Sequence, residues 1–429
     1  MKIRGLRWWI LGLIVLVTII NYLDRNTLGI MWQTIVRDLG LVDPNLPEEE
    51  YKALSKQMFA NINMCFMVAY GLSQLLSGRL YDKIGTRKGF TFSVLLWGLA
   101  DALTSIASGF KSICGFRSAL GLGVAGPWPG AVKSNAEWFP QKQRTLAQGL
   151  FNAGASTGAI LAPILIVLIC SAVGWKWTFV IIGCLGLLWI IPWLIINKKG
   201  PAEHPWITPE EQKFIADGKT AAPQGEGLGW GRLLADKRSY AVIFGRFFMD
   251  PIWWMFVTWL PIYLFDVYGY DVKNIGMTAW VPYVGAALGS IAGGWLPGRL
   301  ISSGRSVNFS RKLSIITGGC ITLPALVYVA FVDDPVVAVL CMAVILFGFQ
   351  FTMNNIQTLA SDFHSGKSVG SLSGLGGAAA TLGTILSICF VPMLTAGGNW
   401  TPFFIMGACL VPMSIICIFV FCGNIKQQA

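Results

Sequence analysis

The composition of this 429-residue chain is that of a protein embedded in a membrane. Apolar and aromatic residues make up 54% of the chain and charged residues only 12%, and the mean hydropathy is +0.61. A soluble globular protein carries about 25% charged residues, so these values exclude that class. The net charge of +11 does not indicate a nucleic-acid partner, because the basic residues lie in short segments between apolar ones, where they set membrane orientation and contact anionic lipid.

Twelve apolar segments are long enough to cross a bilayer, which takes about 20 helical residues. Basic residues between these segments, such as Lys83, Lys142 and Arg311, fall on one side, which the positive-inside rule assigns to the cytoplasm together with both termini. The first segment is interpreted as a retained span, because its apolar run is too long for a signal peptide and no small-residue cleavage site follows. The segments cover residues 8–31, 58–80, 89–108, 112–132, 145–171, 175–197, 239–265, 275–298, 313–332, 335–360, 368–395 and 400–423.

The sequence therefore predicts an all-α integral membrane protein with twelve transmembrane helices in two six-helix halves. Residues 1–197 form the first half, residues 198–238 a cytoplasmic linker rich in Lys, Pro and Gly, and residues 239–429 the second half. Two such halves around a linker are typical of a secondary transporter whose substrate site lies between them. We expect it to be a monomer. Glycines at close-packing spacing, at 154–158 and 370–377, predict tight helix contacts.

An acid and a base interrupt the first apolar segment at Asp24 and Arg25. A charge at this depth costs a few kcal/mol or more, so both side chains are expected to face the protein interior or a watery cavity. The Arg25 guanidinium can bind a carboxylate through two parallel hydrogen bonds. A structural ion pair with an acid is the alternative. Tyr22 lies three residues earlier, on the same helix face.

Five amides lie at membrane depth and are further candidates for a polar binding site. Unpaired amides are costly in a bilayer, so these side chains are expected to face the bundle or its cavity. Hydrogen bonds between helices are the competing explanation for each. The amides are Gln74, Asn152, Asn354, Asn355 and Gln357. An apolar face for a sugar ring would come from Trp128 and from Trp253 or Trp254, unless these only pack.

The loop after the second segment, from Gly78 to Lys88, resembles the loop motif of the major facilitator superfamily. In this interpretation Asp82, with the basic group of Arg87 nearby, meets a helix end or a basic residue of a neighbouring span and forms a cytoplasmic latch. The equivalent point in the second half, 294–299, keeps glycine and arginine but lacks the acid.

Three further motifs narrow the resemblance to the anion:cation symporter family: residues 21–25, Gly115-Phe-Arg117 and Glu137-Trp-Phe-Pro140. Within this family the chain looks most like bacterial hexuronate transporters, at residues 5–8, 133–140, 151–154, 251–253, 259–261 and 361–362. The resemblance implies import of a sugar-acid monoanion, such as glucuronate or galacturonate, by proton symport with alternating access in the inner membrane. It also implies that Tyr22, Arg25 and Tyr70 contact the anion.

Asp24 is the candidate for proton coupling. Burial disfavours its charge while a nearby guanidinium favours it, so the carboxyl can exchange a proton as the cavity opens to alternate sides. Arg117 in the fourth segment is a plausible partner, and the resemblance supports this pairing. Proton-coupled members of the family often carry a second acid in that segment, where this chain has Val124. Of the remaining membrane acids, Asp101 and Asp250, the second can pair along its helix with Arg246.

The sequence argues against other classes of protein. It has no nucleophile–base constellation, only two histidines and no phosphate-binding loop, so we expect neither an enzyme nor a primary pump. The ten scattered cysteines predict no metal, cofactor or disulfide framework. The alternatives left open are other anions such as galactonate or glucarate, sodium coupling, and, more remotely, a non-transporting membrane sensor.

Overall fold

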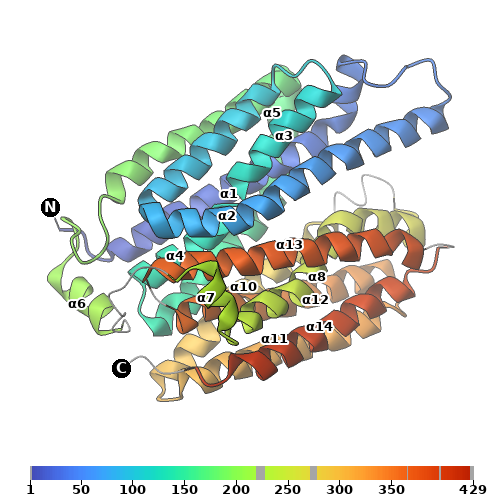
Figure 1. Ribbon diagram of the computed structural model, residues 1–429. Coiled ribbons are helices and arrows are strands. Elements are labelled where there is room, and N and C mark those ends of the chain that lie inside the picture. Colours follow the sequence, from blue (N-terminus) through green and yellow to red (C-terminus); the bar gives the residue numbers. More distant parts are fainter. Residues whose placement is uncertain (1, 219–227, 271–277, 365, 396–397, 426–429) are drawn as a thin grey trace.

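The computed structural model describes residues 2–218, 228–270, 278–364, 366–395 and 398–425 as a bundle of long helices. In Figure 1 the helices of the first half of the chain lie on one side and those of the second half on the other. Two short helices, α6 (Pro209–Asp217) and α7 (Trp230–Ala235), lie at the end that carries both termini. Residues 219–227 of the predicted linker are outside the described residues.

The long helices have the following bounds. In the first half they are α1 (Leu6–Asp38), α2 (Glu48–Thr104), α3 (Phe110–Val124), α4 (Pro127–Trp138) and α5 (Gln141–Ile196). In the second half they are α8 (Ser239–Tyr268), α10 (Val281–Ser302), α11 (Val307–Val329), α12 (Pro335–Phe363), α13 (Val369–Leu394) and α14 (Thr401–Cys422).

Helix α2 reverses its direction at Gly85. This residue has φ 79° and ψ 165°, a conformation that costs a glycine little because it has no Cβ. The Tyr81 and Phe90 rings lie 5.4 Å apart, and the Tyr81 hydroxyl donates to Ser93 Oγ at 3.2 Å. In a straight helix, residues twelve apart would be separated by about 18 Å. One continuous helix thus contains two antiparallel spans.

Helix α5 reverses in the same way at Gly174, which has φ 81° and ψ 167°. Its two arms reach neighbouring positions on α1: Gly154 packs against Val15, and the Trp189 indole donates to the Leu13 carbonyl at 2.8 Å.

The helices account for the predicted crossings. By length and hydropathy, eight of the described helices can cross a membrane, and two of these are the reversing helices α2 and α5. The fourth predicted span is divided into α3 and α4 just before Pro127, which has no backbone N–H to continue the helical hydrogen bonds. The eighth corresponds to α10, which begins at Val281 rather than at 275; residues 275–277 are outside the described residues.

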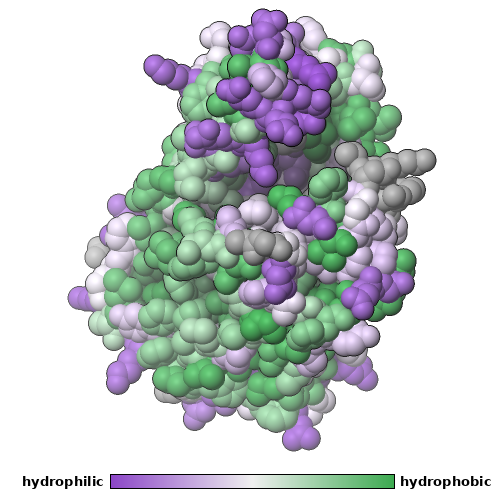
Figure 2. All heavy atoms as spheres, turned by 90° about the vertical axis from the view of Figure 1, so that its right-hand side faces the viewer, coloured by the Kyte–Doolittle hydropathy of each residue, from purple (hydrophilic) through white to green (hydrophobic). Residues whose placement is uncertain are grey.

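The outer surface of the bundle is apolar and its interior contains many small and polar residues. On α2, Leu72 and Leu76 are each 58% exposed, whereas Ser73 and Gln74 are buried. Figure 2 shows the end away from the termini, where hydrophilic side chains gather at the upper edge and hydrophobic ones cover the flanks. This distribution is that of a helical bundle surrounded by lipid.

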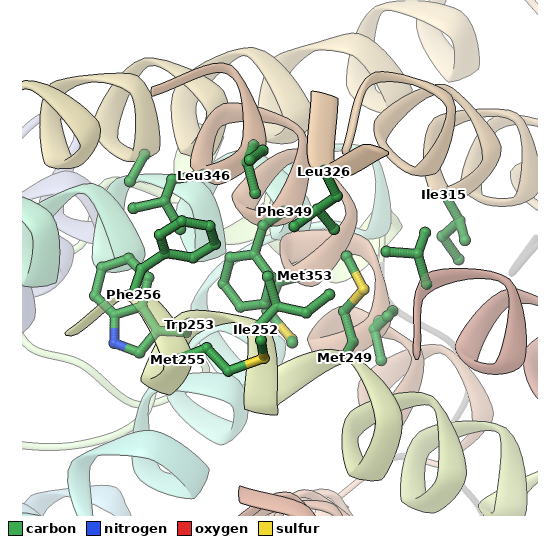
Figure 3. Packing of buried hydrophobic residues seen from close by; sticks show 14 of the residues in the cluster. Met249, Ile252, Trp253, Met255, Phe256, Ile315, Leu326, Leu346, Phe349 and Met353 are labelled. Carbon is green, nitrogen blue, oxygen red and sulfur yellow. The ribbon is translucent and has the colours of Figure 1, made fainter. Parts of the chain in front are cut away.

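The apolar core of the second half lies between α8, α11 and α12. Met249 and Ile252 of α8 pack there with Ile315, Leu326 and other labelled side chains (Figure 3). Trp253 of α8 and Phe349 of α12 stack at 6.0 Å between ring centroids. These two rings continue the core up to the interface between the halves.

Glycines allow the closest helix contacts. A Cβ on Gly285, Gly289 or Gly293 of α10 would lie within 2.4 Å of the α12 backbone. The glycines at 154–158 and 370–377 are likewise in close contact with neighbouring helices, so their prediction as packing residues is confirmed. Gly370 and Gly374 of α13 meet Gly78 of α2 across the two halves.

The linker is attached to the first helix. Glu211 of α6 accepts hydrogen bonds from the Leu6 and Arg7 backbone N–H groups, at 2.9 and 3.3 Å, and forms an ion pair with the Arg7 guanidinium at 3.0 Å. A carboxylate at this position is stabilised by the free N–H groups and dipole of the α1 N-terminus. Thr208 caps α6 by accepting from the Glu211 N–H.

We expect Gly289→Val to destabilise the second half, because its Cβ would lie 2.1 Å from the Phe347 carbonyl oxygen. Overpacking of this kind costs about 1–3 kcal/mol. Thermal unfolding of the purified protein in detergent measures the effect. Gly12→Val is the matched control, since no other atom lies within 4 Å of a Cβ there. Equal unfolding temperatures for the two variants would contradict the close packing of α10 against α12.

Candidate functional site

A small polar cavity lies between the two halves of the bundle. Its wall combines two guanidinium groups, one carboxylate, amides and aromatic rings from both halves. The lining residues are Tyr22, Arg25, Tyr70, Trp128, Asn152, Arg246, Asp250, Trp253, Trp254, Phe349, Gln350, Met353 and Gln357. Hydrogen-bonding groups opposite broad aromatic faces are suited to a small polyol with a charge.

Arg25 presents a positive charge that has no acidic partner among the described residues. Its guanidinium carbon lies 4.6 Å from the Tyr70 ring centroid and 5.6 Å from that of Tyr22. The rings of Phe66 and Trp254 complete this aromatic surround, at 5.8 and 5.9 Å. Cation–π contacts hold the guanidinium in place while leaving its charge uncompensated. An anion entering the cavity would supply the missing charge.

The structure brings five of the eight predicted substrate residues to the cavity: Tyr22, Arg25, Tyr70, Asn152 and Gln357. The other three lie behind its wall. Gln74 donates from Nε2 to the Tyr70 hydroxyl at 2.8 Å, so it positions that tyrosine. Asn354 donates to the Ser290 carbonyl and Asn355 to the Gly293 carbonyl, at 2.6 and 3.1 Å. We therefore reassign these two amides from substrate contact to helix packing.

A chain of hydrogen-bonded amides joins the two halves next to the cavity. Gln357 Oε1 of α12 accepts hydrogen bonds from Asn152 and Gln148 of α5, both at 2.8 Å. Asn152 also donates to Asn354 Oδ1 at 2.7 Å, and Asn135 donates to Gln148 at 3.0 Å. The alternative weighed for these amides, hydrogen bonds between helices, is therefore observed, and Asn152 and Gln357 contribute to both the network and the cavity wall.

Arg246 and Asp250 form an ion pair on the cavity wall formed by α8. The Arg246 Nε donates to Asp250 Oδ2 at 3.0 Å, and its Nη2 to Oδ1 at 3.4 Å. The predicted pairing along the helix is observed. The sequence did not indicate that the pair faces the cavity, because i, i+4 pairs are common on any helix face.

Asp24 and Asp101 lie side by side in the interior of the first half. Asp24 of α1 is fully buried and Asp101 of α2 is 1% exposed, and the two carboxyl groups are neighbours. All four carboxyl oxygens lack a donor among the described residues. Because like charges this close disfavour each other, the arrangement is suited to a pair that shares a proton.

Arg117 of α3 contacts the same cluster through the backbone. Its Nη1 donates to the Asp24 carbonyl and its Nη2 to the Arg25 carbonyl, both at 3.3 Å. The described ion pairs do not include one between the Asp24 and Arg117 side chains. Val124 ends α3, and its carbonyl accepts a hydrogen bond from Asn21 at 3.3 Å. The second acid near Asp24 is thus supplied by α2 rather than by the position of Val124.

Asp82 joins the two halves at the end that carries the termini. Its Oδ1 accepts from Lys133 Nζ of α4 and from the Gly370 N–H, both at 3.1 Å, and its Oδ2 accepts from the Ser371 N–H at 2.6 Å. It therefore caps the N-terminus of α13 and binds a basic group at once. Arg87 lies elsewhere: it donates to the Leu194 carbonyl within the first half. The basic residue of a neighbouring span that Asp82 meets is Lys133.

A second latch lies at the C-terminal end of α12. Asp362 Oδ2 accepts from Arg311 Nε at 2.8 Å, and Arg311 also contacts Thr145 and the Gln141 carbonyl of α5. Both side chains of the Arg311–Asp362 pair are fully buried. The second half therefore has an acid at its latch after all, contributed by α12 and not by the loop at 294–299.

Gln350, Met353 and Phe349 are cavity residues that the sequence reasoning missed. A signal was available, since Gln350, Met353 and Gln357 recur at helical spacing on one face of α12. Arg246 and Asp250 were noticed as a pair but not as part of a site.

Membrane-crossing helices in two groups, with a polar cavity between them and ionic latches at one end, are the architecture of a membrane transporter. A family model described as Major Facilitator Superfamily matches residues 14–388, and the chain belongs to this superfamily. The predicted fold class is confirmed. The solved structure of the proton:xylose symporter XylE is similar, with a TM-score of 0.74 and 14% identity over 99% of this chain and 97% of that one.

Curated relatives agree with the narrower resemblance. The hexuronate transporter of Escherichia coli K12 is 31% identical over 94% of this chain and 91% of its own length. The galacturonate transporter of Dickeya chrysanthemi is 32% identical over 80% of this chain and 96% of its own. A probable galactarate/D-glucarate transporter of Escherichia coli K12 is 27% identical over 98% of this chain. The chain is thus a transporter and not an enzyme.

We expect Asp82→Asn to slow transport while sparing substrate affinity. The neutral side chain would leave Lys133 without its buried counter-charge and weaken the cap on α13, at a cost of about 3–5 kcal/mol for a buried pair. Uptake into vesicles should fall about tenfold or more, and substrate binding in detergent should change less than about threefold. Arg87→Gln is the control, with little effect on either. Equal losses in both variants would contradict the latch assignment.

Proposed function

We propose that this protein imports a sugar-acid monoanion, a hexuronate such as glucuronate or galacturonate, together with a proton. The relatives named for hexuronate and galacturonate transport support this substrate class. The uncompensated Arg25 guanidinium in a cavity lined by amides and tryptophans is the observation that carries the proposal. Arg25 binds the carboxylate, Asn152, Gln350 and Gln357 bind hydroxyl groups, and the aromatic rings contact the sugar face.

Transport follows from alternate opening of the cavity at its two ends. The halves, residues 1–197 and 239–429, move against each other around the site, connected by the linker 198–238. We infer that the end held together by Asp82 and Asp362 is cytoplasmic, because the positive-inside rule places both termini on that side. With this end held together, the cavity loads from the outside. Both termini then lie in the cytoplasm, with the protein in the inner membrane as a monomer surrounded by lipid.

The proton is carried by the Asp24–Asp101 pair. When one carboxyl is protonated, the pair carries a single negative charge and Arg117 stays on the backbone carbonyls of α1. Loss of the proton would leave two buried negative charges, and Arg117 would move to compensate them. Arg25 is adjacent to Asp24 on α1, so movement of Arg117 would also change the contacts of the residue that binds the anion. Release of the proton is thereby coupled to release of the anion on the same side of the membrane.

Arg25→Gln should abolish high-affinity binding of glucuronate, because no other unpaired cation lines the cavity within the described residues. Loss of a bidentate charge-assisted contact in a desolvated site costs about 2–5 kcal/mol, which corresponds to a drop in affinity of roughly 30-fold to several thousand-fold. Calorimetric titration of the purified protein measures it. Arg25→Lys keeps the charge and should lose less. Wild-type affinity in Arg25→Gln would refute the carboxylate assignment.

Asp24→Asn and Asp101→Asn should each separate transport from the proton gradient. A neutral amide keeps the size of the carboxyl but removes the exchangeable proton, so accumulation of labelled glucuronate against a gradient should disappear while counterflow between preloaded vesicles continues. A pH gradient drives wild-type uptake in this assay. Uptake driven instead by sodium alone, or accumulation that survives both substitutions, would contradict proton coupling through this pair.

The main rivals concern substrate and driving ion. Competition of galactonate, glucarate and galacturonate against uptake of labelled glucuronate ranks the substrates. The same assay with and without a sodium gradient distinguishes sodium from proton coupling. A non-transporting sensor predicts binding without any uptake or counterflow.

A further inference from the structure

The ion pair of Arg246 and Asp250 on the cavity wall has no part in the mechanism above. Its two residues are one turn apart on α8, so the pair does not join two helices, and such pairs stabilise a helix by only about 0.2–0.5 kcal/mol. Arg246 alone reaches another helix, by donating from Nη1 to the Ser373 carbonyl of α13 at 3.4 Å. The Asp250 carboxylate therefore balances the buried charge of Arg246 without joining α8 to another helix.

The Arg246 guanidinium binds the Asp250 carboxylate in the way that an arginine binds the carboxylate of a ligand. Both Asp250 oxygens accept from two nitrogens of one guanidinium, which is the fork arrangement that arginine uses for carboxylate ligands. The Arg246 side chain is 6% exposed and that of Asp250 15% exposed, and both line the cavity. Asp250 thus holds the position in which a second carboxylate of a ligand would bind Arg246.

The charges of the cavity wall add up to one positive charge. Arg25, Arg246 and Asp250 are the charged residues among those that line it. A ligand with one carboxylate neutralises this wall. A ligand with two carboxylates would place its second negative charge beside Asp250 with no free cation, and like charges brought together in a desolvated site cost several kcal/mol.

We propose that Asp250, by occupying Arg246, restricts the cavity to sugar acids with one carboxylate and excludes dicarboxylates. This inference rests on the proposed function, since it assumes that a sugar acid binds in this cavity. Asp250 is then a specificity-determining residue with two effects. It repels a second carboxylate, and it keeps Arg246 from binding one, so the site discriminates against the wrong ligand.

Binding of three six-carbon acids to the purified transporter tests this proposal. Glucuronate and gluconate carry one carboxylate each, in cyclic and open-chain form, and glucarate is the open-chain acid with two. Wild-type protein should bind glucarate at least about tenfold more weakly than glucuronate. Asp250→Asn should raise the affinity for glucarate about tenfold or more, because it frees Arg246, without raising that for gluconate. Asp250→Ser, a smaller neutral residue, is a second test if the amide variant does not fold.

Two further variants separate charge from other effects. The double variant Arg246→Gln with Asp250→Asn keeps the net charge of the wall and should return to the wild-type preference. Glu48→Gln removes a negative charge from an exposed position outside the cavity and should leave the preference unchanged. A glucarate affinity that stays at the wild-type value in both neutral variants overturns this inference alone. A wild-type protein that binds none of the three acids overturns the proposed function as well.

Discussion

A charge buried between membrane-spanning helices must be balanced by an opposite charge, a proton or hydrogen bonds, and the interior of this protein is organised by that constraint. Arg246 is balanced by Asp250, and Arg311 by Asp362. Asp24 lies beside Asp101 without a hydrogen-bond donor among the described residues, and the proton that we propose the two share would balance it. Among the buried ionic groups described, Arg25 has aromatic rings but no counter-charge. This uncompensated charge lies in the cavity, where an anionic substrate can balance it.

Helix α12 connects the cavity, the amide chain and the latch. Gln350 and Met353 line the cavity, Gln357 closes it with amides from the first half, and Asp362 forms the latch about 8 Å further along. A shift of α12 relative to α5 would disturb the amide chain and the latch together. In the proposed alternating access, such a shift would therefore act on the cavity and on the latch at once.

The candidate site was partly predictable. Arg25, Tyr22 and Asp24 stood out because polar residues inside an apolar span must serve some purpose, and that argument needs no tertiary structure. Asn354 and Asn355 met the same criterion yet lie behind the cavity wall, since a buried amide can be satisfied by a neighbouring backbone carbonyl as well as by a ligand. Sequence alone does not distinguish these two solutions.

The sequence by itself determined the class of protein, the number of crossings and the residues whose burial demands a reason, because the bilayer imposes length and polarity on each span separately. Only the tertiary structure decided which of these residues meet. Asp101 is 77 positions from Asp24 and Lys133 is 51 from Asp82, and their pairing depends on helix rotation and crossing. Those are set by packing against neighbours, as where Gly370 meets Gly78, and hydropathy along the chain carries no record of them.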